Sequence, residues 1–168
     1  MKRAILICGY EDCGKTSILR YLVTGSTTQQ FKLNKNKSRK LRIGNTEREF
    51  IIQQLSNDDP GLEKYLDDIS KRWIELGGIV DDLIAAFCPN YNDPDNDGVV
   101  ILSNRIFNNF DEIHLMLLLN KWQDKDILDV ERIKQHFRNI GKLHYHEIQS
   151  HNDDRKEDVK AILERIYS

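Results

Sequence analysis

Eight residues near the N-terminus constrain the fold more than any other segment of this chain. Residues 9–16 read G-Y-E-D-C-G-K-T and match the phosphate-loop pattern G-x-x-x-x-G-K-[ST] at every fixed position. An apolar run at residues 4–8 precedes them, and residues 15–23 carry apolar side chains at helical spacing. The order of strand, glycine-containing turn and helix predicts that the chain begins with the first half of a βαβ unit.

Short apolar runs alternate with helical patterns along the rest of the chain. The predicted strands are residues 4–8, 40–43, 49–54, 83–88, 113–119 and 143–148. The predicted helices are residues 15–23, 62–76, 99–110, 130–140 and 159–166. This alternation predicts an α/β fold with a six-stranded, mostly parallel sheet and helices on both faces. Since the chain has 168 residues, we expect a single domain that spans residues 1–168.

Composition and charge exclude several classes of protein. Apolar residues make up 39% and charged residues 31%, which is typical of a globular chain and not of a disordered or fibrous one. The formal net charge of −2 excludes a basic field over the whole surface, so we expect no DNA binding. The longest apolar run is too short for a membrane span, and we expect no membrane anchor. Three cysteines, an odd number, indicate a reduced cytoplasmic protein.

The residue types in the 9–17 segment suit the phosphates of a nucleotide. Glycines let the backbone pass close to a phosphate, and the N–H groups at a helix start point at an anion. A lysine at this position lies between the β- and γ-phosphates, and the Thr16 hydroxyl is a Mg²⁺ ligand. The thiol of Cys13 is either activated by the helix start or fills a small side-chain position. The predicted phosphate-binding residues are Gly9, Asp12, Cys13, Gly14, Lys15, Thr16 and Ser17.

The 9–17 segment resembles the phosphate loop of the Ras- and Arf-like small GTPases, and two later motifs also resemble motifs of that family. Asn120 and Lys121 follow the most apolar predicted strand and look like the start of the base-recognition motif Asn-Lys-x-Asp. Gln149 and Ser150 follow the last predicted strand, where the family has a Ser-Ala-Lys-type motif. The resemblance implies a three-layer P-loop NTPase fold that binds GTP or GDP with Mg²⁺ and meets a protein effector. The base-binding residues that it implies are Asn120, Lys121, Gln123, Asp124, Gln149 and Ser150.

The base-recognition motif departs from the family pattern at one position. Gln123 stands where the family has an aspartate that accepts two hydrogen bonds from guanine. An unmatched buried polar pair costs about 1–3 kcal/mol, so either Asp124 takes the role or selectivity for guanine is weak. The resemblance also implies a threonine that closes over Mg²⁺, for which Thr28 is a candidate, with a solvated Ser/Thr turn as the alternative.

A second departure concerns hydrolysis. After the second strand of the predicted hairpin the family has Asp-x-x-Gly, whereas this chain has Gln54 and Asn57 at those positions. Asp58 or Asp59 would reach the metal only through a different loop path. Because hydrolysis depends on placing a water and neutralising charge, we expect a small-GTPase-like switch with slow or absent intrinsic hydrolysis.

Two other functions fit the same motif. One is a module that binds a nucleotide without hydrolysing it, which Gln54, Asn57 and Gln123 favour. The other is a small ATPase or phosphotransferase, which would need arginines over the phosphates. Arg72 and Arg105 are the candidates for that role.

Two further segments carry charge patterns, and each pattern has two possible interpretations. Asp93, Asp95 and Asp97 match the start of a calcium loop, D-x-D-x-D-G, or else form a turn in which Asp97 caps a helix. Residues 31–42 contain six Lys and Arg residues and no acid. This basic run either meets an acidic protein, a lipid surface or RNA, or is a solvated loop beside an edge strand.

Overall fold

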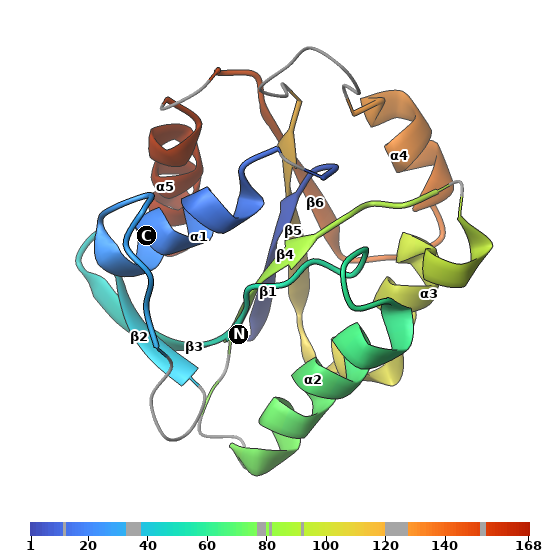
Figure 1. Cartoon of the computed structure of the whole chain (residues 1–168), viewed down its shortest axis with the longest axis horizontal. Coiled ribbons are helices and arrows are strands. Elements are labelled where there is room, and N and C mark those ends of the chain that lie inside the picture. Colours follow the sequence, from blue (N-terminus) through green and yellow to red (C-terminus); the bar gives the residue numbers. More distant parts are fainter. Residues whose placement is uncertain are drawn as a thin grey trace.

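One sheet forms the middle layer of this protein, whose computed structural model describes residues 1–11, 13–32, 38–76, 80, 82–91, 93–119, 128–151 and 154–168 (Figure 1). The strands are β1 (Arg3–Cys8), β2 (Ser38–Ile43), β3 (Thr46–Gln53), β4 (Asp82–Phe87), β5 (Glu112–Leu118) and β6 (Leu143–Ile148). The helices are α1 (Lys15–Thr24), α2 (Leu62–Glu75), α3 (Gly98–Leu102), α4 (Val130–His136) and α5 (Asp154–Ile166), with short 3₁₀ turns η1 (Pro94–Asn96) and η2 (Arg105–Asn109).

The strand order in the described sheet is β2-β3-β4-β1-β5-β6. β2 and β3 form an antiparallel hairpin, and every other neighbouring pair is parallel. Gly44 closes the hairpin with a φ of 58°, a conformation that glycine adopts without strain. The prediction of an α/β fold with a six-stranded, mostly parallel sheet is therefore confirmed.

Helices cover both faces of the sheet, also as predicted. In Figure 1 the sheet is seen nearly edge on, with α1 and α5 on the left and α2, α3 and α4 on the right. Alternate residues of β1 serve the two layers: Ile5 and Ile7 pack with α1 and α5, whereas Leu6 packs with the other three helices. Because β1 is buried on both faces and paired on both edges, its sequence is an unbroken apolar run.

Three predicted helix boundaries are wrong. The helix predicted at residues 99–110 is divided into α3 and η2, because the Asn104 side chain accepts a hydrogen bond from the Ile106 N–H (3.1 Å) and starts a new turn. α4 ends at His136 and not near Gly141. The Asp59-Pro60 pair has the sequence of a helix cap followed by proline at the first helical position, but α2 begins after Gly61, so the pair lies in the preceding turn and does not cap the helix.

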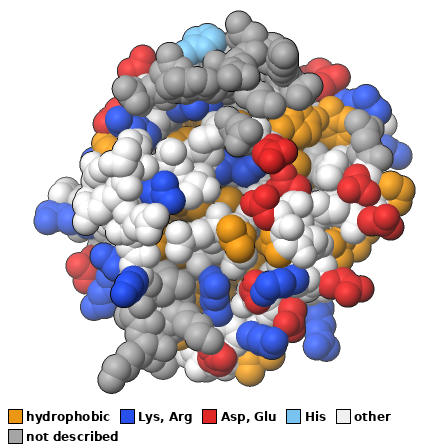
Figure 2. Space-filling view, in the orientation of Figure 1, with side chains coloured by type: hydrophobic (Ala, Val, Ile, Leu, Met, Phe, Trp, Pro, Cys, Tyr) orange, Lys and Arg blue, Asp and Glu red, His pale blue; other side chains and the backbone are white. Residues whose placement is uncertain are grey.

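Charge on the surface is mixed, in keeping with the small net charge. Figure 2 shows acidic and basic side chains interspersed over the visible face of the described residues. Every helix in the described ranges is too short or too polar to cross a bilayer. The basic run is described only in part: Arg39, Lys40 and Arg42 lie on β2, at an edge of the sheet, and residues 33–37 lie outside the described residues.

Replacing Gly98 with alanine is expected to destabilise the fold by about 1–3 kcal/mol. A Cβ atom at this position would lie 2.7 Å from Phe137 Cζ and 3.1 Å from Phe87 Cζ, both in the core. Gly141→Ala is the matched control, since no atom lies within 4 Å of its Cβ position. Urea unfolding of both variants measures the difference, and equal midpoints would contradict the packing described here.

Candidate functional site

The carboxyl edge of the sheet brings together predicted site residues from distant parts of the chain. Because β3, β4, β1, β5 and β6 run parallel, the segments that follow them meet at one edge. The 9–17 segment follows β1, and Gln149 and Ser150 follow β6 at the same edge. The predicted residues Asp12, Asn120, Lys121, Gln123 and Asp124 lie outside the described residues.

The Lys15 side chain folds back over the turn that precedes it. Its ammonium donates to the carbonyl oxygens of Gly9 (2.6 Å) and Tyr10 (2.9 Å), and the residue is only 8% exposed. An ammonium carries three N–H donors, so these two bonds leave one for a further acceptor. The lysine therefore places a positive charge inside the turn between β1 and α1.

α1 starts without a side-chain cap. Its N-cap residue is Gly14, in the left-handed conformation with a φ of 90°, and its first helical hydrogen bond runs from the Ile18 N–H to the Gly14 carbonyl (3.1 Å). The N–H groups of the three preceding residues point out of the helix start. Asp97 and Asp129, by contrast, cap α3 and α4 with their carboxylates. An anion is thus better accommodated at the start of α1 than at those two helices.

Cys13 fills the space inside the turn. Its Sγ lies 2.1 Å from the position that a Cβ atom on Gly9 would take, so only glycine fits there. Burial raises the pKa of the Cys13 thiol, although the charge of Lys15 acts in the opposite direction. Of the two roles considered for Cys13, the structure favours the packing one. Cys8 and Cys88 are also buried and form no disulfide.

Arg155 reaches the same turn from the far end of the chain. It lies in the first turn of α5, is 7% exposed, and donates from Nη1 to the Cys13 carbonyl (2.7 Å). A Cβ atom on Gly14 would lie 3.0 Å from its Nη2. Sequence reasoning missed this second cation, because the polar start of a helix gives no sign of what it packs against.

β4 lies between β1 and β3 in the sheet. The segment after β3, where the small GTPases have Asp-x-x-Gly, is therefore not directly beside the 9–17 segment that follows β1. The end of β3, where Gln54 stands in the Asp-x-x-Gly position, is two strand spacings from β1, or about 10 Å. Asn57 crosses the gap: its Oδ1 accepts from the Cys88 N–H (2.6 Å) and its Nδ2 donates to the Cys88 carbonyl (3.1 Å). The fully buried Asn57 amide therefore pairs with the end of β4 as a strand backbone would.

The Asn57 contact brings Asp58 close to the turn. Burial and the charge of Asp58 raise the pKa of the Cys88 thiol to about 12, and the same carboxylate acts on Cys13. The Oδ1 atom of Asp58 is buried without a hydrogen-bond partner in the described structure. Of the two acids that would need a different loop path to reach a metal, Asp58 is thus the one whose charge acts on Cys13 in the 9–17 segment.

Two other sets of polar groups lie at this edge. The Ser150 hydroxyl is buried and has no hydrogen-bond partner within the described part of the chain. Tyr10 and Tyr91 join their hydroxyl groups (2.9 Å) across the ends of β1 and β4, and the Arg132 guanidinium lies over the Tyr91 ring (4.7 Å). Sequence reasoning did not include this tyrosine pair.

Three candidates from the sequence lie elsewhere. Thr28 lies beyond the last turn of α1, whereas Thr16 lies on its first turn. The Thr28 hydroxyl shares a hydrogen bond with Ser26 Oγ (3.2 Å), as in the Ser/Thr turn considered above. Arg72 donates to the Ile52 carbonyl near the carboxyl end of β3, two strands away from β1. Arg105 lies in η2, which leads into the amino end of β5, at the opposite edge of the sheet.

The acidic residues of the calcium-like loop act as caps. Asp93 accepts from the Asp95 N–H (3.0 Å), and Asp97 accepts from the Val99 N–H (2.8 Å) and lies 2.8 Å from His136 Nε2. These contacts agree with the predicted capping role of Asp97. Among the described residues, no three His, Cys, Asp or Glu side chains form a set suited to a metal ion.

Three histidines gather on the edge of the sheet away from the hairpin. The register of β5 and β6 pairs His114 with His144, whose rings stack at 4.8 Å. His114 Nδ1 lies 3.0 Å from His146 Nε2, and His114 Nε2 lies 3.1 Å from Glu112. Burial lowers the pKa of His114 and, with the charges of His114, His144 and Arg165, lowers that of His146 to about 4.

Comparison with known proteins identifies no relative. No model of a protein family matches the chain, and the search of curated proteins gave no significant match.

The contact between Gly9 and Cys13 predicts a coupled pair of substitutions. Gly9→Ala is expected to lower the free energy of unfolding by about 1–3 kcal/mol, because its Cβ overlaps the Cys13 sulfur. Cys13→Ala removes the sulfur, so the double variant should recover most of that loss. Urea unfolding of both single variants and the double variant measures the coupling. Additive effects would show that the sulfur does not occupy this space.

The His146 pKa predicts a loss of stability in acid. Since its pKa falls from an ordinary 6.5 to about 4 on folding, the unfolded chain binds the extra proton between these values. The contribution of His146 to stability is fully present above pH 6.5 and is lost as the pH falls toward 4. Because the ring is only half buried and solvent screens its charge, the loss on going to pH 5 is expected to be about 1 kcal/mol. Comparing urea unfolding at pH 7 and pH 5 for His146→Gln and for His151→Gln, an exposed control, isolates the effect. The first variant should lose part of the pH dependence and the second should retain it.

Proposed function

We propose that this chain binds the phosphate tail of a nucleoside triphosphate, with Mg²⁺, at the carboxyl edge of its sheet. The observation that carries the proposal is the buried Lys15 ammonium, held inside the turn by two carbonyl groups with one donor remaining. It lies at the start of α1, whose first N–H groups have no side-chain cap. A fixed cation and open helix N–H groups together suit a polyphosphate.

The residues present fit a magnesium ion. Mg²⁺ keeps several waters and takes one or two protein ligands beside the phosphates. Thr16 is exposed on the first turn of α1, and Asp58 offers a buried carboxylate oxygen without a partner in the described structure. The ion would neutralise phosphate charge, while Lys15 and the helix start bind the anion.

A guanine base and a switch function extend this proposal. The Ser150 hydroxyl, buried without a described partner, lies where the resemblance to small GTPases implies contacts to the base. A protein effector would then read the loops that contact the γ-phosphate. Because all three thiols are free, we expect the protein to be cytoplasmic.

The position of β4 favours the second candidate, a nucleotide-binding module that does not hydrolyse its ligand. Gln54 lies at the end of β3, one strand removed from the turn, and its amide cannot act as a general base. Arg72 and Arg105 lie away from the turn, which weakens the case for an ATPase or phosphotransferase. We therefore expect slow or absent hydrolysis.

Nucleotide binding is tested first with Lys15. The purified protein is expected to bind fluorescent GTP, and Lys15→Ala should weaken the affinity by about 10- to 100-fold, as for a lost charge-assisted hydrogen bond. Lys64→Ala is the control, since Lys64 pairs with Asp68 on the surface of α2. Failure of the native protein to bind any nucleoside triphosphate would overturn the proposal. Equal affinity for ATP and GTP would overturn only the preference for guanine.

The role of Asp58 is tested through magnesium. Asp58→Asn is expected to weaken nucleotide binding by about 5- to 20-fold in Mg²⁺ and to leave it unchanged in excess EDTA. Asp59→Asn, at the exposed neighbouring position, should behave as the native protein does. Isothermal titration calorimetry in both buffers gives the comparison. Equal losses in EDTA and in Mg²⁺ would mean that Asp58 acts on the turn and not on the metal.

A further inference from the structure

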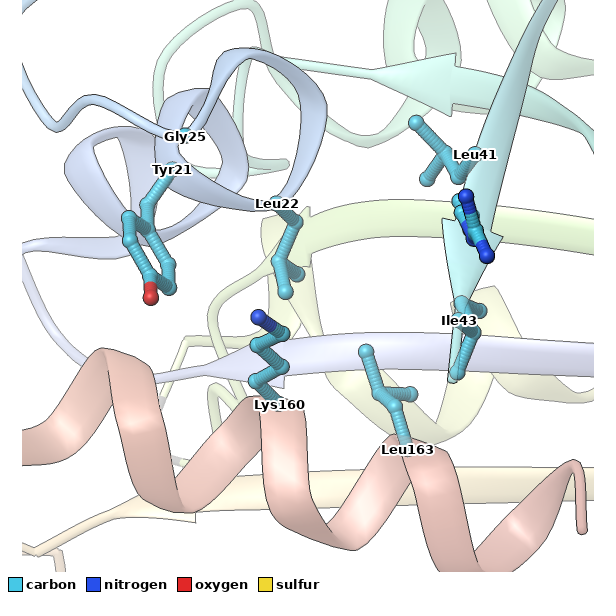
Figure 3. A pocket seen from close by; sticks show the side chains of 8 residues that line it. Tyr21, Leu22, Gly25, Leu41, Ile43, Lys160 and Leu163 are labelled. Atoms are coloured by element: carbon cyan, nitrogen blue, oxygen red, sulfur yellow. The ribbon is translucent and has the colours of Figure 1, made fainter. Parts of the chain in front are cut away.

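A pocket of about 210 Å³ lies between the end of α1, the edge strand β2 and the middle of α5 (Figure 3). It sits beside the last turn of α1, whereas the 9–17 segment leads into the first turn of the same helix. None of the residues proposed to bind a nucleotide lines it. The pocket is therefore a separate feature of the structure.

Part of the wall of this pocket is apolar, and three of its four aliphatic side chains are buried in the core. These side chains are Leu22, Leu41, Ile43 and Leu163, of which the last three are less than 8% exposed and belong to the core between the sheet and α1 with α5. Figure 3 shows Lys160 and Leu163 pointing from α5 into the space between α1 and β2. The volume exceeds the roughly 150 Å³ of a cavity that holds benzene. A small apolar group therefore fits without displacing the walls.

The charged side chains that line the pocket are both cations. Arg42 comes from β2 and Lys160 from α5, and the lining contains no carboxylate. Two acids of α5 lie outside the lining but act on Tyr21: Glu157 accepts the hydrogen bond of its hydroxyl, and the charge of Glu164 also raises its pKa. Lys160 lies over the Tyr21 ring at 6.0 Å, and Arg42 has one bond of 3.4 Å from Nε to the Gly44 carbonyl.

Two carbonyl groups near the end of α1 are bonded within the helix end. The carbonyl of Tyr21 accepts from the Gly25 N–H (2.8 Å), and the carbonyl of Arg20 accepts from Thr24 Oγ1 (2.8 Å). Carbonyl groups that would otherwise repel an anion are thus already bonded within the helix end. Within the lining, Arg42 and Lys160 are therefore the charged side chains that a ligand meets.

We propose that this pocket binds a small amphipathic carboxylate, an organic acid with a short hydrocarbon tail. The tail lies between Leu22, Leu41 and Leu163, and the carboxylate faces Lys160 and Arg42. Apolar burial supplies the affinity, and the cations select an acid over an alcohol or an amine of the same length.

Octanoate is the probe for this site. It is expected to bind saturably and to shift the NMR signals of the leucine and isoleucine methyl groups in the pocket, whereas octanol binds about tenfold more weakly and octylammonium more weakly still. Lys160→Gln, at an exposed position on α5, should weaken octanoate binding by about tenfold. Lys40→Gln is the matched control, because Lys40 lies on β2 and pairs with Glu47 at 3.4 Å.

Three results would overturn the assignment. The first is octanol binding as tightly as octanoate, which would show that charge plays no part. The second is an equal loss for Lys160→Gln and Lys40→Gln, which would indicate a general attraction to basic residues. The third is methyl shifts spread over the surface with no saturation. Each of these leaves nucleotide binding at Lys15 untouched, since the two tests share no residue.

Discussion

The bonds from the Lys15 ammonium to the carbonyl oxygens of Gly9 and Tyr10 fix the turn on which the rest of the site depends. β1 is buried on all sides, so the chain leaves it at the carboxyl edge and must turn at once into α1. A buried carbonyl without a partner would cost free energy, and a lysine inside the turn supplies the donor. The same arrangement concentrates positive charge where the N–H groups of α1 emerge.

Strand order decides which side chains can reach that turn. Since β4 separates β1 from β3, residues at the end of β3 need a bridge, and the buried Asn57 amide provides it by pairing with both backbone groups of Cys88. The bridge carries Asp58 to the turn and leaves Gln54 behind on β3. The neighbouring groups thus favour the proposed binding of an anion and a metal more than the placement of an attacking water.

The fold was largely predictable because its signals are local. The buried parallel strands read as apolar runs, and the glycines at residues 14, 25 and 44 mark the turns where a positive φ is required. The helix predicted at residues 99–110 failed for a local reason too: Asn104 can either continue a helix or cap a new one, and only its surroundings decide.

The site was less predictable, because its contacts join residues far apart in the sequence. The phosphate-loop pattern identified Lys15 and Gly14, but Arg155 lies 142 residues from the carbonyl that it contacts. Likewise, the two-residue period of a strand puts His144 and His146 on one face of β6, whereas the register that adds His114 is set by the pairing of β5 with β6. Periodicity gives the face of a strand; which strand lies beside it is a property of the whole sheet.

α1 links the two regions to which we assign ligands. Its first turn starts beside the Lys15 cation, and its last turn forms one wall of the apolar pocket, about 15 Å away for ten residues. Both ends are fixed by packing against α5, through Arg155 at the first and Leu163 at the second. A rigid helix held at both ends transmits a displacement only as a whole. Any effect of one ligand on the other must therefore involve a shift of α1 along α5, and without such a shift the two sites act independently.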